Sequence, residues 1–214
     1  MTDLDFGFWD SLGAYNISQV PTAADAYDYH IARAVRIEEL GFHSYWVIEH
    51  QNSPVAEITS PTVYLTAVAM RTSKLRVGAM VWQIPFHNPL RLAEEVAMLD
   101  HLSRGRVEFG SGIGVHEHEF IRWNLNYYER GPMSIEAMDI IMKAWTEPEV
   151  TYNGKYWTFN EALPAPKPYQ VLDSFSRKPG TFSLAPLPNS IVKIRALPLL
   201  RFLIFSRSEI GRAH

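Results

Sequence analysis

Residues 75–114 read LRVGAMVWQIPFHNPLRLAEEVAMLDHLSRGRVEFGSGIG and alternate between two kinds of hydrophobic pattern. Residues 75–82 are almost wholly apolar, which is typical of a strand buried on both faces of a parallel sheet. Residues 89–102 begin with a proline and continue with apolar residues at helical spacing, which are Leu92, Val96 and Leu99. Residues 106–110 predict a further short strand. The stretch therefore predicts a strand, a helix and a second strand parallel to the first.

The residues before this stretch repeat the same order. Residues 4–10 predict a strand, because aromatic residues dominate them, and residues 22–40 predict a helix that ends at Gly41. Residues 43–48 predict a strand, and residues 61–71 predict a helix with a proline in its first turn. Strands that alternate with helices belong to the α/β class. We expect a parallel sheet covered by helices on both faces and connected by right-handed crossovers.

The alternation changes after the fourth predicted strand. Residues 134–145 predict an amphipathic helix whose inward side chains are Ile135, Met138, Ile141, Met142 and Trp145. Residues 151–159, TYNGKYWTF, predict a β-hairpin. The dipeptide Asn153-Gly154 within it predicts a type I′ turn.

Charge divides the chain near residue 170. Residues 171–214 contain seven basic and two acidic side chains, a formal charge of +5, whereas residues 1–170 carry −8. Serine, proline and arginine are enriched in residues 171–214, which show no regular period. We therefore expect residues 1–170 to fold together and residues 171–214 to form an unrelated, poorly ordered tail.

Composition limits the classes of function. Of the 214 residues, 47% are hydrophobic and 20% are charged, as in ordinary globular proteins. The formal charge of −3 predicts no nucleic-acid partner, and the absence of cysteine excludes disulfides, thiolate zinc sites and cysteine nucleophiles. No stretch reaches the roughly 18 uninterrupted apolar residues of a membrane span, and the N-terminal residues lack the pattern of a signal peptide. We expect a cytoplasmic protein without a membrane partner.

The carboxyl ends of the strands are where parallel α/β sheets carry their functional residues. His50 follows the second predicted strand and is the group there that titrates near neutral pH. Glu49 beside it is placed to fix the tautomer of His50 or to raise its pKa. His50 is therefore a candidate acid or base, although a histidine after a strand also serves as a structural hydrogen-bonding group. The sequence leaves both interpretations open.

Three glycines, Gly110, Gly112 and Gly114, follow the fourth predicted strand. Their spacing differs from the G-x-G-x-x-G fingerprint and they do not open the first βα unit, which disfavours a nucleotide-binding module of the Rossmann type. Glycine allows the backbone to approach a flat or anionic ligand closely. A crowded turn requires the same residue type, so both interpretations stay open.

The segment that follows, from His116 through Glu117 and His118 to Glu119, contains four potential metal ligands. It lacks the H-E-x-x-H spacing that places two histidines on one face of a helix. Histidines two positions apart on a helix point about 200° away from each other. We therefore expect no metal site here.

The stretch quoted at the outset, together with WVIEHQ before it and KAWTEPEVTYNGKYWTFNEALPAPKPYQ after it, closely resembles the bacterial luciferase-like flavin-dependent monooxygenases. The resemblance covers about residues 4–170. It implies a (β/α)8 TIM barrel, of which this chain has about the first four βα units and a hairpin. It also implies that reduced FMN, or the deazaflavin F420 in some relatives, binds at the carboxyl-terminal mouth. With FMN and oxygen, such enzymes oxidise an aldehyde, a ketone or a hydrocarbon.

The resemblance also implies roles for individual residues. His50 matches the histidine that assists the flavin chemistry in the luciferases. Met80 and Val81 match the pair that lies under the flavin ring, where many members have a non-prolyl cis peptide. Gly112 stands where the luciferase alpha chain has a reactive cysteine, which points away from luciferase itself. Ile113 stands where some members place an arginine on the flavin phosphate.

The partners that the resemblance implies are a small-molecule substrate, a flavin reductase that supplies reduced flavin, and a second copy of the chain in a homodimer. A TIM barrel typically needs about 250 residues, so the chain is expected to lack the later strands. Two further hypotheses remain open. The chain is a catalytically inactive half-barrel, or it belongs with the F420-dependent oxidoreductases.

Overall fold

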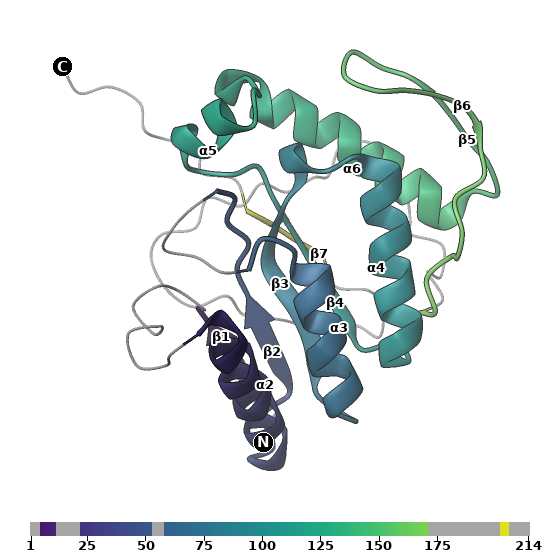
Figure 1. The fold of residues 1–214 in the computed structure, drawn as a ribbon. Helices are drawn as coiled ribbons and strands as arrows, with labels where there is room; N and C mark the ends of the chain where they lie inside the picture. The colour runs from purple at the N-terminus through teal and green to yellow at the C-terminus, as the bar shows by residue number, and fades with distance from the viewer. Residues whose placement is uncertain (1–4, 12–21, 53–57, 171–201, 206–214) are drawn as a thin grey trace.

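The computed structural model describes residues 5–11, 22–52, 58–170 and 202–205 (Figure 1). Its large sheet is parallel, and the first four strands lie side by side in the order of the sequence. These strands are β1 (Gly7–Asp10), β2 (Ser44–Val47), β3 (Arg76–Gln83) and β4 (Val107–Gly112). A fifth strand, β7 (Phe202–Phe205), pairs with β4 in the parallel direction. Apart from β7, the tail expected at 171–214 lies outside the described residues.

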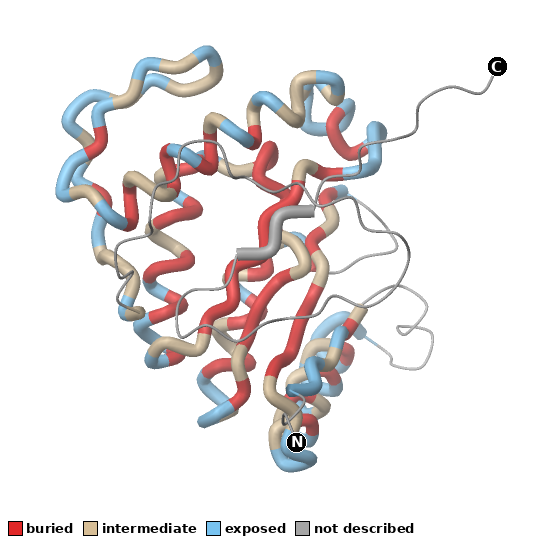
Figure 2. Tube along the Cα trace, turned by 180° about the vertical axis from the view of Figure 1, so that it is seen from behind, coloured by how far each residue is buried: buried red, intermediate tan, exposed pale blue. Residues whose placement is uncertain are grey.

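The outer face of the sheet is covered by the helices α2 (Ala23–Glu39), α3 (Pro61–Arg71) and α4 (Pro89–Ser103) (Figure 1). Residues of these helices and of β2, β3 and β4 form one hydrophobic cluster, and Figure 2 shows buried residues concentrated along the strands. Helices on both faces, as the alternation alone predicted, are not found in the described part of the chain. The arrangement is that of a partial barrel, in which the strands also bury their inner face.

Local signals in the sequence determine where these helices begin and end. The side chains of Thr22, Ser60 and Asn88 each accept a backbone N–H at the start of a helix. Gly41 has a φ of +82°, a conformation that ends α2 and that other residues adopt only at a cost. The predicted bounds of all three helices agree with the structure to within one residue. Within the described ranges, no helix is both long enough and apolar enough to cross a membrane.

Two more helices, α5 (Glu117–Arg122) and α6 (Arg130–Thr146), follow β4. The prediction of a helix over 134–145 is correct, but Ile135 is 70% exposed instead of buried, and Met142 is only half-buried. The inward face contains small residues that periodicity of large apolar residues does not reveal, namely Ser134, Ala137 and Ala144. This face packs against α4, and small side chains at such a contact allow two helices to approach closely.

The hairpin is confirmed, but its predicted turn is wrong. Strands β5 (Val150–Asn153) and β6 (Thr158–Ala162) are antiparallel, and four residues connect them instead of two. The carboxylate of Glu136 on α6 accepts the backbone N–H groups of all three residues at 155–157. A Cβ atom on Gly154 would lie 2.0 Å from Oε1 of this carboxylate. Gly154 therefore makes room for Glu136 and does not form a type I′ turn.

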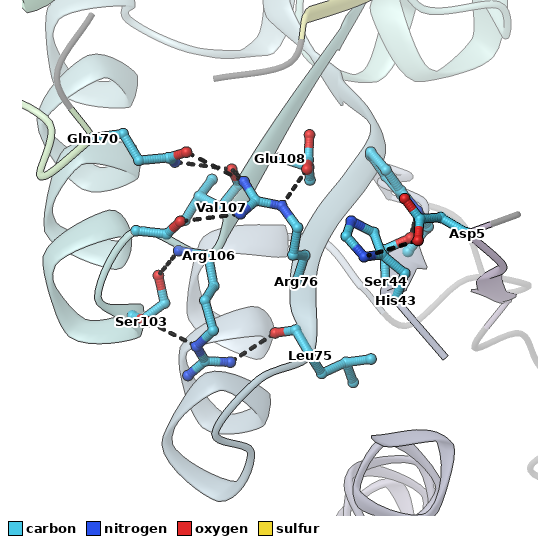
Figure 3. Close-up of polar contacts among 12 residues, drawn as sticks. Asp5, His43, Ser44, Leu75, Arg76, Ser103, Arg106, Val107, Glu108 and Gln170 are labelled. Carbon is cyan, nitrogen blue, oxygen red and sulfur yellow. Dashed lines mark hydrogen bonds and ion pairs between the residues drawn. The ribbon is translucent and has the colours of Figure 1, made fainter. Parts of the chain in front are cut away.

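Arg106 holds together the end of the barrel that lies opposite the carboxyl ends of the strands (Figure 3). Its guanidinium donates to backbone carbonyls at the ends of α3 and α4 and at the start of β3, which belong to Ala69, Thr72, Leu75 and Ser103. Gln170 connects the end of the described segment to α4, because its backbone N–H donates to Asp100 over 2.8 Å. Polar contacts thus fix the base of the sheet, at the end opposite the carboxyl ends of the strands.

Candidate active site at the carboxyl ends of the strands

A cavity of about 790 Å³ opens at the carboxyl ends of β1 to β4. The segment between β4 and α6 forms part of its wall. This segment contains the short helix η2 (Tyr127–Glu129), whose Tyr127 and Tyr128 line the cavity. All the site residues singled out from the sequence line this cavity, namely His50, Met80, Val81, Gly112 and Ile113. The fold therefore brings together residues that three separate strand ends contribute.

Met80 and Val81 reach the cavity together because β3 has a bulge. The pairing of β3 with β4 shifts register here, so that these two residues oppose the single residue Gly110. Side chains that would alternate in a regular strand therefore both line the cavity. The peptide bond between Met80 and Val81 is cis, as the resemblance implied.

The glycines of β4 allow this strand to lie against the bulge. A Cβ atom on Gly110 would be 2.3 Å from the carbonyl oxygen of Ala79, and one on Gly112 would be 2.3 Å from Cγ2 of Val81. No side chain fits at either position. Of the two interpretations of the glycines, crowding is therefore confirmed at Gly110 and Gly112, and the wall at Gly112 is formed by bare backbone.

His50 lies in the wall of the cavity and is held by Glu119. Nδ1 of His50 is 2.9 Å from Oε1 of Glu119, whose side chain is fully buried. Burial by itself raises the pKa of Glu119, but the hydrogen bond and the charge of His50 outweigh burial and lower it. The ionised carboxylate therefore accepts the Nδ1 proton. We infer that neutral His50 has its acceptor nitrogen at Nε2.

Glu49 does not hydrogen-bond to His50, although their adjacency in the sequence suggested that it would. The Glu49 carboxylate is 2.8 Å from Nε2 of His87 and accepts the backbone N–H of Gln83 over 2.6 Å. Consecutive residues of an extended chain point in opposite directions, so Glu49 turns away from His50. The carboxylate partner comes from α5 instead, 69 residues later in the chain.

Gln83 connects these two carboxylate–histidine pairs. Its Nε2 donates to the carbonyl oxygen of Glu49 over 2.6 Å and to Oε2 of Glu119 over 3.2 Å. Gln83, Glu49 and Glu119 are all almost fully buried. The three side chains therefore form a rigid polar layer behind His50, in which each carboxylate is paired with a histidine.

Arg130 is the cationic side chain among the residues that line the cavity. Its guanidinium carbon lies 3.7 Å from the ring centroid of Tyr127, and Nη1 donates to the carbonyl of the same residue over 2.8 Å. Its Nε is buried, and it has no hydrogen-bond partner in the described part of the chain. This atom is a donor that an anionic ligand would satisfy after a small shift of the side chain.

Sequence reasoning missed Glu119 as the partner of His50, and it missed the roles of Gln83, His87 and Arg130. Glu119 stood in the segment considered for metal binding. One signal was available, because the helix that starts after His116 places its third residue, Glu119, on the buried face with Phe120. Over the described residues, no group of three or more potential ligands is arranged to hold a metal ion.

Replacing His87 by glutamine tests the buried pair that it forms with Glu49. Burial alone lowers the pKa of His87, but the hydrogen bond and the charge of Glu49 outweigh burial and raise it. A histidine whose pKa is higher in the folded state than in the unfolded state stabilises the fold. The full stabilisation is present at pH values below the unfolded-state pKa of about 6.5, and it is lost as the pH rises through the folded-state pKa. We expect urea denaturation to show the largest loss of stability for His87→Gln below about pH 6, with a smaller loss at alkaline pH.

Glu49→Gln is the matched variant for this experiment. It should remove the same pH-dependent stabilisation, and the double variant should lose little more than either single variant. A stability difference for His87→Gln that stays constant or grows with increasing pH would show that the two side chains are not an ion pair.

The sequence matches the luciferase-like monooxygenase family over residues 7–185, which extends past residue 170, where the resemblance was expected to end. Limonene 1,2-monooxygenase of Rhodococcus erythropolis is 31% identical over 62% of this chain and 34% of that protein. The oxygenase component of the flavin-dependent trigonelline monooxygenase of Acinetobacter baylyi is 28% identical over 72% of this chain and 43% of that protein. The chain thus spans less than half the length of both relatives.

Solved structures show the same fold. Monooxygenase RslO1 from Streptomyces bottropensis superposes with a TM-score of 0.73 at 25% identity, over 78% of this chain and 50% of that one. The oxygenating constituent of 3,6-diketocamphane monooxygenase from Pseudomonas putida, in complex with FMN, superposes with a TM-score of 0.66 at 23% identity. The superposition covers 79% of this chain and 45% of that one. An F420-dependent secondary alcohol dehydrogenase with an F420-acetone adduct superposes with a TM-score of 0.63 at 25% identity. The superposition covers 77% of this chain and 49% of that one. The chain belongs to the luciferase-like monooxygenase family.

Proposed function

We propose that the protein is a flavin-dependent monooxygenase that uses reduced FMN and molecular oxygen to oxidise a small neutral molecule, such as an aldehyde, a ketone or a hydrocarbon. One observation carries this proposal. The cavity combines a histidine–carboxylate pair, His50 and Glu119, with the apolar bulge at Met80 and Val81, in a chain of this family.

The lining of the cavity fits a flat, apolar ring with an anionic group attached. Met80, Val81 and Ile113 supply apolar surface, and Gly112 supplies bare backbone beside them. Ile113 offers no charge where the resemblance implies an arginine in some members. The proposal therefore assigns the phosphate of FMN to Arg130, whose Nε lacks a partner in the described part of the chain.

The reduced flavin, when bound, supplies the electrons for the activation of molecular oxygen. His50 acts at Nε2, where it holds a proton for the ligand or removes one from it. Glu119 orients the imidazole through Nδ1, because its carboxylate is buried and lies 2.9 Å away. Gln83 fixes Glu119 in turn. Trp9 and Tyr127, which also line the cavity, reduce the access of water to this site.

The proposal includes a separate flavin reductase, because the trigonelline relative is described as an oxygenase component. It also includes a homodimer and a cytoplasmic location. A second candidate is an F420-dependent oxidoreductase, which the likeness to the F420-dependent alcohol dehydrogenase supports. In that case His50 would exchange a proton with an alcohol or a carbonyl group, and oxygen would take no part.

A comparison of FMN with riboflavin tests the assignment of the phosphate. We expect Arg130→Met to weaken FMN binding about tenfold or more, because a charge-assisted hydrogen bond is lost, and to leave riboflavin binding nearly unchanged. Flavin fluorescence titrations of the 214-residue chain measure both affinities, and an F420 titration decides between the cofactors.

Arg122→Met is the matched control, since Arg122 donates to the carbonyl of Asn52 and does not line the cavity. Equal losses of FMN and riboflavin affinity in Arg130→Met would remove Arg130 from the phosphate site. If the wild-type chain binds neither FMN nor F420, the proposed function is wrong for this polypeptide.

Rates of substrate oxidation with reduced FMN test the role of His50. We expect His50→Gln to lower the rate about a hundredfold and Glu119→Gln to lower it by a smaller factor, with FMN affinity changed little in both, because general acid–base catalysis is lost or weakened. Undiminished rates in His50→Gln would contradict the role. A wild-type chain that binds FMN without turnover would support the inactive half-barrel.

A further inference from the structure

One side chain fills the inside of the barrel below the cavity. Trp46 of β2 is only 4% exposed. A Cβ atom on Gly7 of β1 would lie 3.1 Å from its indole Nε1, and one on Gly78 of β3 would lie 2.7 Å from its Cζ3. A side chain at either position would displace the indole. Gly7, Trp46 and Gly78 therefore face the same, inner side of three neighbouring strands.

The residues two positions further along these strands line the cavity. They are Trp9 on β1, Ile48 after β2 and Met80 on β3. Because side chains alternate along a strand, these three residues share the inner face. Trp9 pairs with Trp46 in the sheet and lies level with it, whereas Ile48 and Met80 lie one layer nearer to the carboxyl ends. Trp46 itself is not among the lining residues, so its indole lies one layer beneath Ile48 and Met80, beside Trp9.

A charged side chain, Arg76, lies in the layer beneath Trp46. Nε1 of Trp46 donates to Oγ of Ser44 over 2.9 Å. Arg76 is level with Ser44 in the sheet. It is paired with the carboxylate of Glu108 and donates to the carbonyl of Val107 (Figure 3). Glu108 is almost fully buried. Glu108 is level with Trp46 across the sheet, and Arg76 lies in the layer beneath the indole. A ligand that passed the indole would have to desolvate Arg76.

We propose that Trp46 is a specificity-determining residue: its indole blocks the inside of the barrel one layer beneath Ile48 and Met80, and it limits the length of the apolar ligand that the cavity accepts. The indole also keeps the apolar end of the ligand away from Arg76. The inference rests on the cavity being the ligand site of the proposed function, but it does not depend on which cofactor binds there.

The test measures how affinity depends on ligand length. Straight-chain alcohols from pentanol to decanol are titrated into the 214-residue chain without flavin, by calorimetry. In the wild type, we expect affinity to rise about fourfold with each buried methylene until the chain reaches Trp46, and then to stop rising. In Trp46→Leu, the rise should continue to longer alcohols.

Trp82→Leu is the matched control. Trp82 is equally buried, but it stacks on Phe109 and donates to Thr62 on the outer side of the sheet. Its loss should leave the length limit unchanged. Trp46→Phe is a milder variant, and a circular dichroism melt establishes that each variant is folded.

An unchanged length limit in folded Trp46→Leu and Trp46→Phe would overturn the proposal, and so would the absence of alcohol binding by the wild type. The FMN titration is a separate readout. A limit that moves in a chain that does not bind flavin would refute the flavin function alone. Flavin binding with a limit that does not move would refute the role of Trp46 alone.

Discussion

The close approach of β3 and β4 is the constraint on which the site depends. At Gly110 and Gly112 the two strands leave no space for a Cβ atom, and opposite them Met80 and Val81 form a bulge. The bulge turns two consecutive side chains toward the cavity, where a regular strand would present one. A larger residue at either glycine would separate the strands and change the wall that the proposed flavin contacts.

Behind this wall, buried charges are arranged so that each has a partner. Glu119 holds His50, Glu49 holds His87, and Gln83 joins the two carboxylates. An isolated carboxylate at such depth would be strongly unfavourable, whereas a paired and hydrogen-bonded one is tolerated. The apolar surface of the cavity and the two histidine–carboxylate pairs beside it can therefore coexist within a few residues of each other.

The sequence predicted the order of strands and helices well, because capping residues, prolines and apolar spacing are local signals. The five site residues also came together as expected, since the carboxyl ends of parallel strands meet at one edge of a sheet. Pairings between distant segments could not be predicted. Glu119 reaches His50 from a helix far along the chain, and Glu136 replaces the expected type I′ turn with a longer loop.

Ile135 illustrates a different limit. Its spacing suggested an inward position, but α6 turns a face of small residues toward α4. Which side of a helix is buried depends on the neighbour that it meets. That information lies outside the helix itself.

The most direct test of a flavin in this cavity is an NMR titration of the chain labelled at its methionine methyl groups. Met80 lines the cavity, whereas Met70 and Met98 are more than half exposed on the outer helices. If FMN stacks on the bulge, the methyl signal of Met80 shifts by the ring current in a saturable manner, while the signals of Met70 and Met98 stay in place. Saturable FMN binding that leaves the Met80 signal unmoved would contradict a flavin site at the bulge.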